Sequence, residues 1–498
     1  MFVKSIEEIN ERIKKGEAVV VTAEEMIDIV EDKGVKEAAK EVDVVTTGTF
    51  GMMCSSGVFF NFGHADPPIK MTRVWMNNVE AYTGVAAVDA YLGVTQISTD
   101  RGIEYGGAHV IEDLLNGKEI ELRAEAYGTD CYPRKVLETM ISLEEVNQAV
   151  MVNPRNAYQK YVAATNSTDE KLYTYMGVLL PNYGNVTYSG AGQLAPLPND
   201  PNYETIGIGT RIFLGGAVGY IIGEGTQHNP QNFLGTLMVR GNLKEMSTDF
   251  LKAAVMEKYG PTLFVGLGIP IPIINENLAE KTAIRDSDIN VNVLDYGVPR
   301  RDRPVVKETN YEELKKGTIE INGREVKTSP LSSYRKARII AEELKSWIEN
   351  KKFLISLPAE RLPTKRLFKP MAIKKPLPTV RNVMRKEFVM CTPQNDIKEV
   401  ARIIVEKGFD HIPVVEEGNK LVGVVTSWDI ANAVASDKKS LSDIMTTKVI
   451  TAREEESIDV VARRLSRHDI SGAPVVDPQN RVIGIITTDD IARWLGVI

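Results

Sequence analysis

The chain has 498 residues, 43% of them hydrophobic and 26% charged, with a formal net charge of −7 at pH 7. These values are ordinary for a globular protein of about three domains, and the slight negative charge gives no reason to expect nucleic-acid binding. No run approaches about 18 consecutive apolar residues, so no membrane-spanning helix is expected.

The cysteines and the N-terminal segment bear on the cellular compartment. Three cysteines, at positions 54, 131 and 391, are too few and too far apart for a disulfide framework. The first residues, MFVKSIEE, carry early acids and no apolar core of the length found in signal peptides. We therefore expect a protein of the reducing cytoplasm.

Residues 1–360 are expected to form a large domain of α/β or α+β class, whose topology the pattern leaves open. Amphipathic helices are predicted at 5–15 and at 22–33, where Thr22 resembles an N-cap, and a strand is predicted at 42–46. A further helix at 333–349 is predicted to close this domain.

Glycine-rich stretches invite a test for dinucleotide binding. Residues 190–195 read GAGQLA, which fits the loose G-x-G-x-x-A form, but the following PLPNDP is not expected to open the required helix. Most of these glycines are therefore interpreted as turns. The histidines are isolated and show no metal-ligand spacing, so no metal site is predicted; they are His64, His109, His228, His411 and His468.

Two cysteines are the remaining candidates for chemistry. A helix is predicted to begin at Pro133, which would place Cys131 at its N-terminus beside Arg134 and Lys135 and would favour the thiolate. Cys54 lies in the run GMMCSSG, whose backbone amides could also stabilise a thiolate or an oxyanion. The alternative for any cysteine is an inert buried side chain, which is the interpretation preferred for Cys391.

A segment rich in proline and basic residues follows the large domain. Residues 361–379 hold four prolines, six basic residues and no acid. Because proline favours an extended chain, this segment is predicted to be a semi-rigid linker.

The last part of the chain contains one motif twice. Residues 411–415 and 423–429 read HIPVV and GVVTSWD, and residues 472–476 and 484–490 read GAPVV and GIITTDD. The prolines, glycines and final aspartates are all offset by 61 positions, which indicates duplication. In each copy an apolar strand runs into a helix, and the polar motif residues fall at that junction: Thr426, Asp429, Thr487 and Asp490.

These residues resemble a CBS pair, with repeats at 380–436 and 441–498. The resemblance implies a sensor of an adenosyl ligand and association into a homodimer through this module. A helix N-terminus favours an anion, and a carboxylate there can accept ribose hydroxyls, so the four motif residues are predicted to bind the ligand. The alternative is that each Thr and Asp only caps its helix.

The large domain resembles the homocysteine-biosynthesis family of methanogenic archaea. The resemblance rests on GMMCSSG at 51–57, HADPPI at 64–69, GTDCYP at 128–133 and GLGIPIP at 266–272. It implies that L-aspartate semialdehyde and sulfide are converted to L-homocysteine, with a separate ferredoxin-like iron–sulfur protein as electron source. No tightly bound cofactor is expected in the catalytic domain.

Within that resemblance Cys131 is predicted to carry sulfur as a persulfide, and Cys54 to assist as resolving thiol or acceptor, with reversed roles left open. The substrate carboxylate could be held by Arg123, Arg134 or Lys135. S-adenosylmethionine or methylthioadenosine is the expected regulatory ligand. Two alternatives remain at this point: a different thiol enzyme with a CBS sensor, and a non-enzymatic sensor of an adenosyl ligand.

Overall fold

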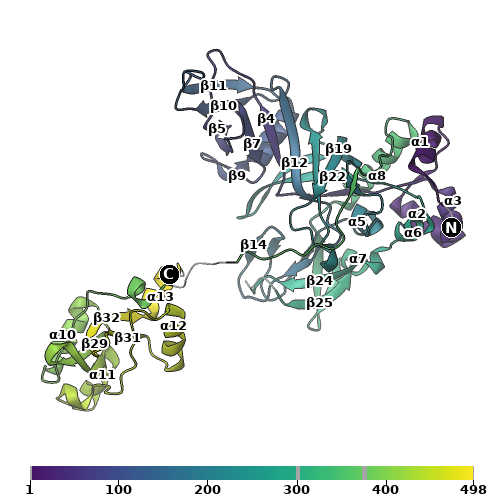
Figure 1. Ribbon diagram of the computed structural model, residues 1–498. Coiled ribbons are helices and arrows are strands. Elements are labelled where there is room, and N and C mark those ends of the chain that lie inside the picture. The colour runs from purple at the N-terminus through teal and green to yellow at the C-terminus, as the bar shows by residue number, and fades with distance from the viewer. Residues whose placement is uncertain (1–2, 299–302, 373–377, 497–498) are drawn as a thin grey trace. The chain divides into compact units, whose positions relative to one another are not determined.

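The computed structural model describes residues 3–298, 303–372 and 378–496 (Figure 1). The chain divides between Lys369 and Pro370 into two compact units. Three helices predicted from the sequence are present, and each has a side-chain N-cap, of which the one at Thr22 was predicted. They are α1 (Ile6–Lys15, capped by Ser5), α2 (Ala23–Lys33, capped by Thr22) and α8 (Tyr334–Glu349, capped by Ser333).

The centre of the N-terminal unit is a nine-stranded sheet in which all neighbouring strands are antiparallel; eight strands form one continuous order, and β3 pairs with β22 outside that order. The continuous order is β21 (Leu251–Met256), β22 (Gly260–Gly268), β18 (Arg211–Leu214), β19 (Ala217–Glu224), β20 (Leu237–Asn242), β12 (Gln148–Asn156), β4 (Gly57–Asn61) and β7 (Asp89–Gly93), and β3 is Thr49–Met52. Helix α4 (Gly107–Leu115) packs against β21 and β22.

Two six-stranded sheets flank this centre, and Figure 1 shows them at opposite ends of the unit. One consists of β11 (Val136–Ile141), β10 (Ile120–Glu125), β5 (Arg73–Met76), β6 (Val79–Ala81), β8 (Ile97–Ser98) and β9 (Gly102–Gly106). The other consists of β25 (Val305–Asn310), β24 (Asn290–Asp295), β13 (Ala163–Thr165), β16 (Val186–Tyr188), β27 (Arg324–Pro330) and β26 (Thr318–Ile321), with α7 (Tyr311–Lys315) packed on it.

Four helices surround a small three-stranded sheet in the N-terminal unit. Strands β1 (Val20–Thr22), β2 (Val44–Thr46) and β23 (Pro270–Pro272) form a three-stranded sheet. Helices α2, α3 (Val35–Glu41), α6 (Glu276–Lys281) and α8 bury their apolar faces around it. The predicted strand at 42–46 is thus present as β2, and the mixed α/β class expected for this unit is confirmed.

The helix predicted to start at Pro133 is wrong. Residues Val136–Ile141 form the edge strand β11, paired over its full length with β10 from Ile120↔Ile141 to Glu125↔Val136. Six cross-strand pairs outweigh the weak local preference for a helix. The prolines after residue 195 do open a helix, but α5 (Pro196–Asn199) is only four residues long.

The first part of segment 361–379 packs on the N-terminal unit. Residues Glu360–Arg361 form β28, which pairs with β17 (Gly207–Ile208), and Arg366 forms an ion pair with Glu224. Residues 373–377 of the predicted linker lie outside the described residues.

The C-terminal unit repeats one pattern of elements, after the short helix α9 (Val380–Val383). The first copy has α10 (Ile397–Lys407), β29 (His411–Glu416), β30 (Lys420–Thr426) and α11 (Ser427–Ala435), and the second has α12 (Ile458–Arg467), β31 (Gly472–Val476), β32 (Val482–Thr487) and α13 (Thr488–Leu495). Backbone bridges obey the same offset of 61: Cys391↔Val414 corresponds to Ala452↔Val475. The duplication seen in the sequence is therefore a structural repeat.

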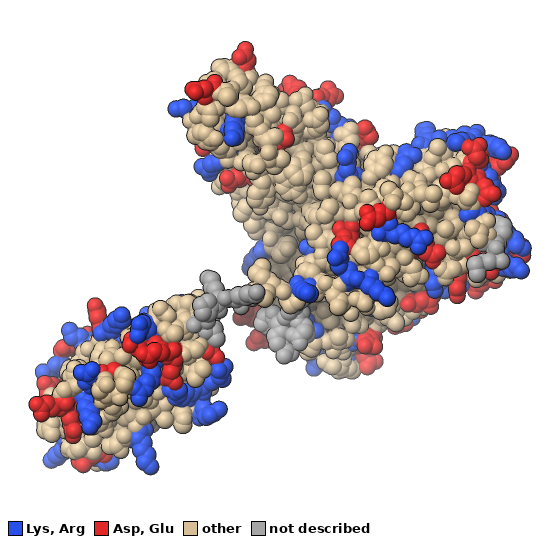
Figure 2. Space-filling view, in the orientation of Figure 1, with Lys and Arg blue, Asp and Glu red and all other residues tan. Residues whose placement is uncertain are grey.

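Charges are mixed on the visible face of both units, where Figure 2 shows Lys and Arg interspersed with Asp and Glu. In the described part of the chain, no helix combines the length and the apolar character needed to cross a bilayer.

Candidate active site and sensor site

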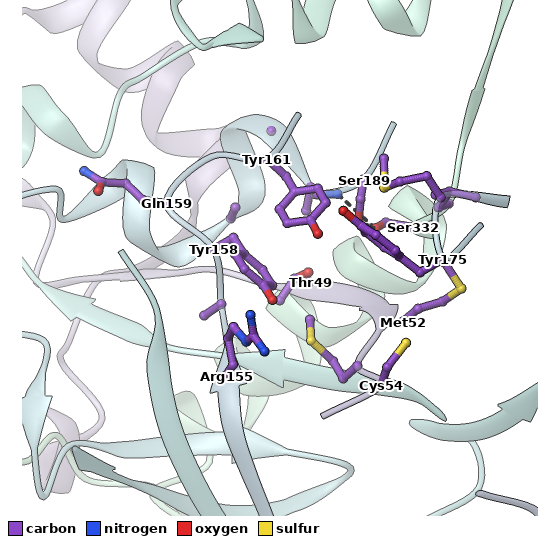
Figure 3. Close-up of a pocket in the computed structure, with 18 of the residues that line it drawn as sticks. Thr49, Met52, Cys54, Arg155, Tyr158, Gln159, Tyr161, Tyr175, Ser189 and Ser332 are labelled. Carbon is purple, nitrogen blue, oxygen red and sulfur yellow. Dashed lines mark hydrogen bonds between the residues drawn. The ribbon is translucent and has the colours of Figure 1, made fainter. Parts of the chain in front are cut away.

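A cavity of about 340 Å³ lies in the N-terminal unit, between the nine-stranded sheet and the sheet of β13, β16 and β24 (Figure 3). Segments far apart in the sequence supply its walls. Among its lining residues are Thr49, Met52, Cys54, Ser55, Arg155, Tyr158, Gln159, Tyr161, Tyr175, Ser189, Gly190, Tyr259, Tyr311 and Ser332. Arg155 is the only charged residue among the described residues that line it.

Cys54 lies in the tight turn between β3 and β4. The Ser56 amide donates to the Met53 carbonyl over 3.0 Å and closes the turn, so Cys54 and Ser55 occupy its centre. The amides of these two central residues have no acceptor within the described part of the chain. The half-buried sulfur lies 3.2 Å from Oγ1 of Thr262. The sulfur therefore has a hydroxyl partner, and the turn presents two backbone amides that are free to bind an anion, as predicted from the sequence of this run.

Arg155 reaches the cavity because β12 is irregular near its end. The pairing of β12 with β20 shifts register between Asn153 and Asn156, and Pro154 lies within the irregular stretch. Such bulges bend a strand and re-aim a side chain. In Figure 3 the guanidinium of Arg155 points toward Tyr158, and Cys54 projects from the same side of the cavity.

A buried asparagine connects the cysteine turn to the arginine. The Asn153 side-chain oxygen accepts from the Ser55 hydroxyl at 3.0 Å and from the Arg155 amide at 2.9 Å. Its Nδ2 donates to the Ser56 hydroxyl at 2.9 Å. Because Asn153 is fully buried, these bonds are shielded from water and fix Cys54 relative to Arg155.

Neutral phenols form the opposite wall. Burial raises the pKa of Tyr158 to about 12, although the Arg155 charge acts against this rise. Burial, with neighbouring Tyr175 and Tyr158, also raises the pKa of Tyr161. The Tyr175 and Tyr296 hydroxyls are hydrogen-bonded at 2.8 Å. The Tyr158 and Tyr161 hydroxyls therefore stay protonated at neutral pH and can donate hydrogen bonds to a bound oxygen.

Another part of the cavity lining depends on a glycine, because the backbone at Gly190 passes close to the Tyr311 side chain. Gly190 has φ +105°, and a Cβ built there would lie 2.3 Å from the Tyr311 hydroxyl. That hydroxyl donates to the Ser189 carbonyl at 2.6 Å, and the Gly190 amide donates to Oγ of Ser332 at 3.0 Å. Only glycine combines this dihedral with the available space.

Cys131 lies elsewhere, at the exposed tip of a turn. The backbones of Thr129 and Tyr132 exchange hydrogen bonds across the turn, and the Tyr132 ring stacks on His64 with centroids 5.8 Å apart. Arg134 donates to the carbonyls of Asp66 and Pro67 at 2.7 and 2.9 Å. The motifs at 64–69 and 128–133 therefore meet in space.

The two candidate cysteines lie at opposite ends of β4. Cys54 precedes the strand by three residues, and His64, which follows it by three, stacks beside the Cys131 turn. At about 3.4 Å per residue the five-residue strand spans about 14 Å between its end Cα atoms. The structure thus does not bring the two sulfurs together.

None of the cations proposed from the sequence lines the cavity. Arg134 holds the backbone beside Cys131, and Arg123 lies 4.2 Å from the centre of the Trp75 ring. Lys135 is exposed and packs beside Gly128. The sequence analysis did not propose Arg155, although Pro154, directly before it inside a strand pattern, indicates a bulge or a strand edge.

In the C-terminal unit the motif residues form two matching caps. The Thr426 side chain accepts from the Asp429 amide, and the Asp429 carboxylate accepts from the amide and hydroxyl of Thr426, both at 2.8 Å. Thr487 and Asp490 repeat this arrangement at the start of α13. The capping alternative is therefore correct as a description of the local bonding. The caps use Oδ2 of each aspartate, and Oδ1 of Asp490 accepts a hydrogen bond from Arg385, whereas Oδ1 of Asp429 has no partner among the described residues.

The second cap borders a pocket of about 220 Å³. Its walls come from both repeats and include Arg385, Phe388, Asp410, His411, Ser471, Thr487 and Asp489. Arg385 forms an ion pair of 2.7 Å with Asp490. Thr446 takes the place of Arg385 beside the first cap, since the bridge Val424↔Thr446 corresponds to Arg385↔Ile485. The two cap sites thus differ in charge.

Comparison with known proteins identifies the large domain. The family model described as "Homocysteine biosynthesis enzyme, sulfur-incorporation" matches residues 18–355. The chain belongs to this family. The CBS domain model matches residues 380–436 and 441–497, so the predicted tandem CBS module is also confirmed.

Relatives match the chain over its whole length. The L-aspartate semialdehyde sulfurtransferase of Methanocaldococcus jannaschii is 58% identical, covering 100% of this chain and 99% of that protein. The protein of the same name from Methanosarcina acetivorans is 57% identical, covering 99% of each. The predictions of an enzyme and of a sulfurtransferase of homocysteine biosynthesis are therefore confirmed. A solved CBS domain pair in complex with 5′-methylthioadenosine and S-adenosyl-L-methionine is 45% identical, with a TM-score of 0.24, and covers 24% of this chain and 98% of the solved one.

The three cysteines should differ sharply in reactivity. Cys131 is exposed, Cys54 is half-buried in the cavity, and Cys391 is buried with its pKa raised to about 11 by desolvation. Because alkylation requires an accessible thiolate, we expect iodoacetamide at pH 8 to label Cys131 first, Cys54 more slowly, and Cys391 only after unfolding. Peptide mapping by mass spectrometry reads the order, and rapid labelling of native Cys391 would contradict the fold of the first repeat.

Proposed function

We propose that the chain converts L-aspartate semialdehyde and sulfide to L-homocysteine. The observation that carries the proposal is the cavity in which the Cys54 thiol faces neutral phenols and a single cation, Arg155. Such a lining suits a small aldehyde with a carboxylate. The names of two full-length relatives support the same activity.

The net reaction needs two electrons. The aldehyde, hydrogen sulfide, two electrons and two protons give the thiol and one water. As the family resemblance implies, we assign the electrons to a separate ferredoxin-like iron–sulfur protein.

Both cysteines take part in the proposed sulfur transfer. Hydrosulfide attacks a Cys54–Cys131 disulfide at the Cys131 sulfur, which forms the Cys131 persulfide and releases the Cys54 thiolate. The outer persulfide sulfur then bonds to the aldehyde carbon, and the carbonyl oxygen takes a proton. Cys54 attacks the Cys131 sulfur, restores the disulfide and releases the hydroxy-thiolate. Loss of water gives a thioaldehyde, which two electrons and two protons reduce to the thiol.

This scheme requires an arrangement in which the turn bearing Cys131 reaches the cavity, since a disulfide needs Cα atoms within about 7 Å. The exposure of Cys131 suits the entry of sulfur from outside, while the enclosed position of Cys54 suits work on the bound aldehyde. Exchanging the two cysteines in the scheme places the persulfide on Cys54 instead.

The assay combines the purified chain with sulfide, L-aspartate semialdehyde and a low-potential ferredoxin-type reductant. Homocysteine should form, and Cys131→Ser and Cys54→Ser should each lower the rate by about 100-fold or more, as for an essential nucleophile. Cys391→Ser, away from the cavity, is the matched control and should stay within about twofold of the wild type.

Mass spectrometry after sulfide treatment separates the roles. An added sulfur on the Cys131 peptide supports the assignment, and one on the Cys54 peptide reverses it. Mild oxidation should trap the Cys54–Cys131 disulfide. Full activity of both serine variants would sink the thiol mechanism, and absence of homocysteine with wild-type protein would sink the proposed function.

We also propose that the CBS pair binds S-adenosylmethionine or methylthioadenosine and adjusts flux into homocysteine. The support is the paired Thr and Asp caps, whose carboxylates can accept ribose hydroxyls, joined to an enzyme of homocysteine synthesis. Regulation additionally requires that the ligand prefer one conformation of the module.

Calorimetry of the full chain with S-adenosylmethionine, methylthioadenosine, AMP and ATP identifies the ligand. Asp429→Ala and Asp490→Ala should each weaken one site by about 1–3 kcal/mol, roughly 5- to 150-fold, because buried hydroxyls lose their acceptor. Asp443→Ala, a surface acid outside both caps, is the control. Binding of AMP or ATP alone would reject the methionine-related ligands, and unchanged binding in both cap variants would leave the carboxylates with a capping role only.

A homodimer formed through the CBS module is proposed as well. Helices α10 and α11 expose large apolar side chains, with Val405 83%, Trp428 73% and Val434 73% exposed. Surface of this kind is usually covered by a partner. Sedimentation at micromolar concentration should give a dimer, and Val405→Glu with Val434→Glu should shift it to a monomer. A wild-type monomer would refute the proposal.

A further inference from the structure

Among the described residues, the guanidinium of Arg155 has no anionic partner. Its Nε is buried without a hydrogen bond, and no carboxylate of the described residues pairs with it. The Nε atoms of Arg123, Arg211 and Arg303 are also buried without a hydrogen bond, but of these four arginines Arg155 alone lines the cavity. Burying a cation without a counter-charge is unfavourable, so natural proteins keep such a group mainly where a ligand supplies the charge. The space in which a ligand anion could lie beside Arg155 is the cavity that this residue lines.

The backbone of Arg155 is tied to the turn that carries Cys54. Asn153 binds both the Arg155 amide and the Ser55 hydroxyl, and the Ser55 hydroxyl also donates to the Arg155 carbonyl at 3.3 Å. The residues that carry the cation and the thiol therefore lie together at one side of the cavity. A molecule that carries an anion and an electrophilic carbon a few bonds apart can contact both.

We propose that Arg155 binds the α-carboxylate of the substrate and directs its aldehyde carbon toward Cys54. The inference rests on the proposed function and names the residue that sets substrate specificity. A guanidinium can bind a carboxylate through two parallel N–H donors, which fixes orientation as well as position. Since no acid lines the described cavity, recognition of an amino acid depends on its carboxylate rather than its ammonium group.

Kinetics with two aldehydes tests this role. L-Aspartate semialdehyde carries the carboxylate, and 3-aminopropanal is the same aldehyde without it. Arg155→Gln should raise KM for L-aspartate semialdehyde by roughly 10- to 150-fold, with a smaller change in kcat, because charged hydrogen bonds to the substrate are lost. The variant and the wild type should use 3-aminopropanal equally poorly. Arg155→Lys should recover part of the loss.

Arg123→Gln is the matched control, because Arg123 packs on Trp75 outside the cavity, and it should leave both KM values unchanged. Circular dichroism and thermal unfolding of each variant exclude misfolding. An equal loss on both aldehydes in Arg155→Gln would overturn the proposal, as would an unchanged KM for L-aspartate semialdehyde.

Protection of Cys54 provides a test without turnover. L-Homoserine has the same carboxylate but no aldehyde, and it should slow alkylation of Cys54 in the wild type and in Arg123→Gln, but not in Arg155→Gln. 3-Aminopropanol, which lacks the carboxylate, should protect none of them. If wild-type protein is protected but makes no homocysteine, the proposed function fails while the anion site stands. If protection by L-homoserine persists in Arg155→Gln, the role of Arg155 fails while the proposed function stands.

Discussion

The hydrogen bonds of one buried amide hold the candidate active site together. Asn153 joins the turn that carries Cys54 to the irregular end of β12 that carries Arg155. The pairing of β12 with β4, which places Val152 opposite Gly57, keeps the two segments in register. Without the Asn153 side chain, the buried Ser56 hydroxyl and the Arg155 amide would lose a partner, at about 1–3 kcal/mol for each unsatisfied group. The thiol and the cation would then no longer share one rigid frame.

The electrostatics of the cavity follow from its place between two sheets. Burial keeps the phenols of Tyr158 and Tyr161 neutral and leaves the Arg155 charge uncompensated. In a medium of lower polarity than water, such a charge attracts a bound anion more strongly. Cys131, by contrast, lies on an exposed turn at the other end of β4. The fold thus separates the exposed thiol of Cys131 from the cavity that contains Cys54.

The sequence predicts those features that depend on neighbouring residues. The cap at Thr22 predicts one helix start, apolar periodicity predicts the helices at 5–15 and 333–349, and the 61-residue offset reveals the CBS pair because both copies keep their anchors. A local sequence pattern does not predict secondary structure correctly where pairing with a distant strand determines it. Residues 136–141 have a helix-compatible pattern, but they pair with β10 as a strand. The cavity joins segments from Thr49 to Ser332, so a cation such as Arg155 is recognised only when the sheets are in place.

The account depends most on the claim that the substrate binds between Arg155 and Cys54. The direct measurement is a crystal structure of the full chain with L-homoserine, an unreactive relative of the aldehyde. The account predicts that its carboxylate contacts the Arg155 guanidinium and that its hydroxyl-bearing carbon faces the Cys54 sulfur. A ligand bound beside Cys131, or in the cavity with its carboxylate directed away from Arg155, would contradict it.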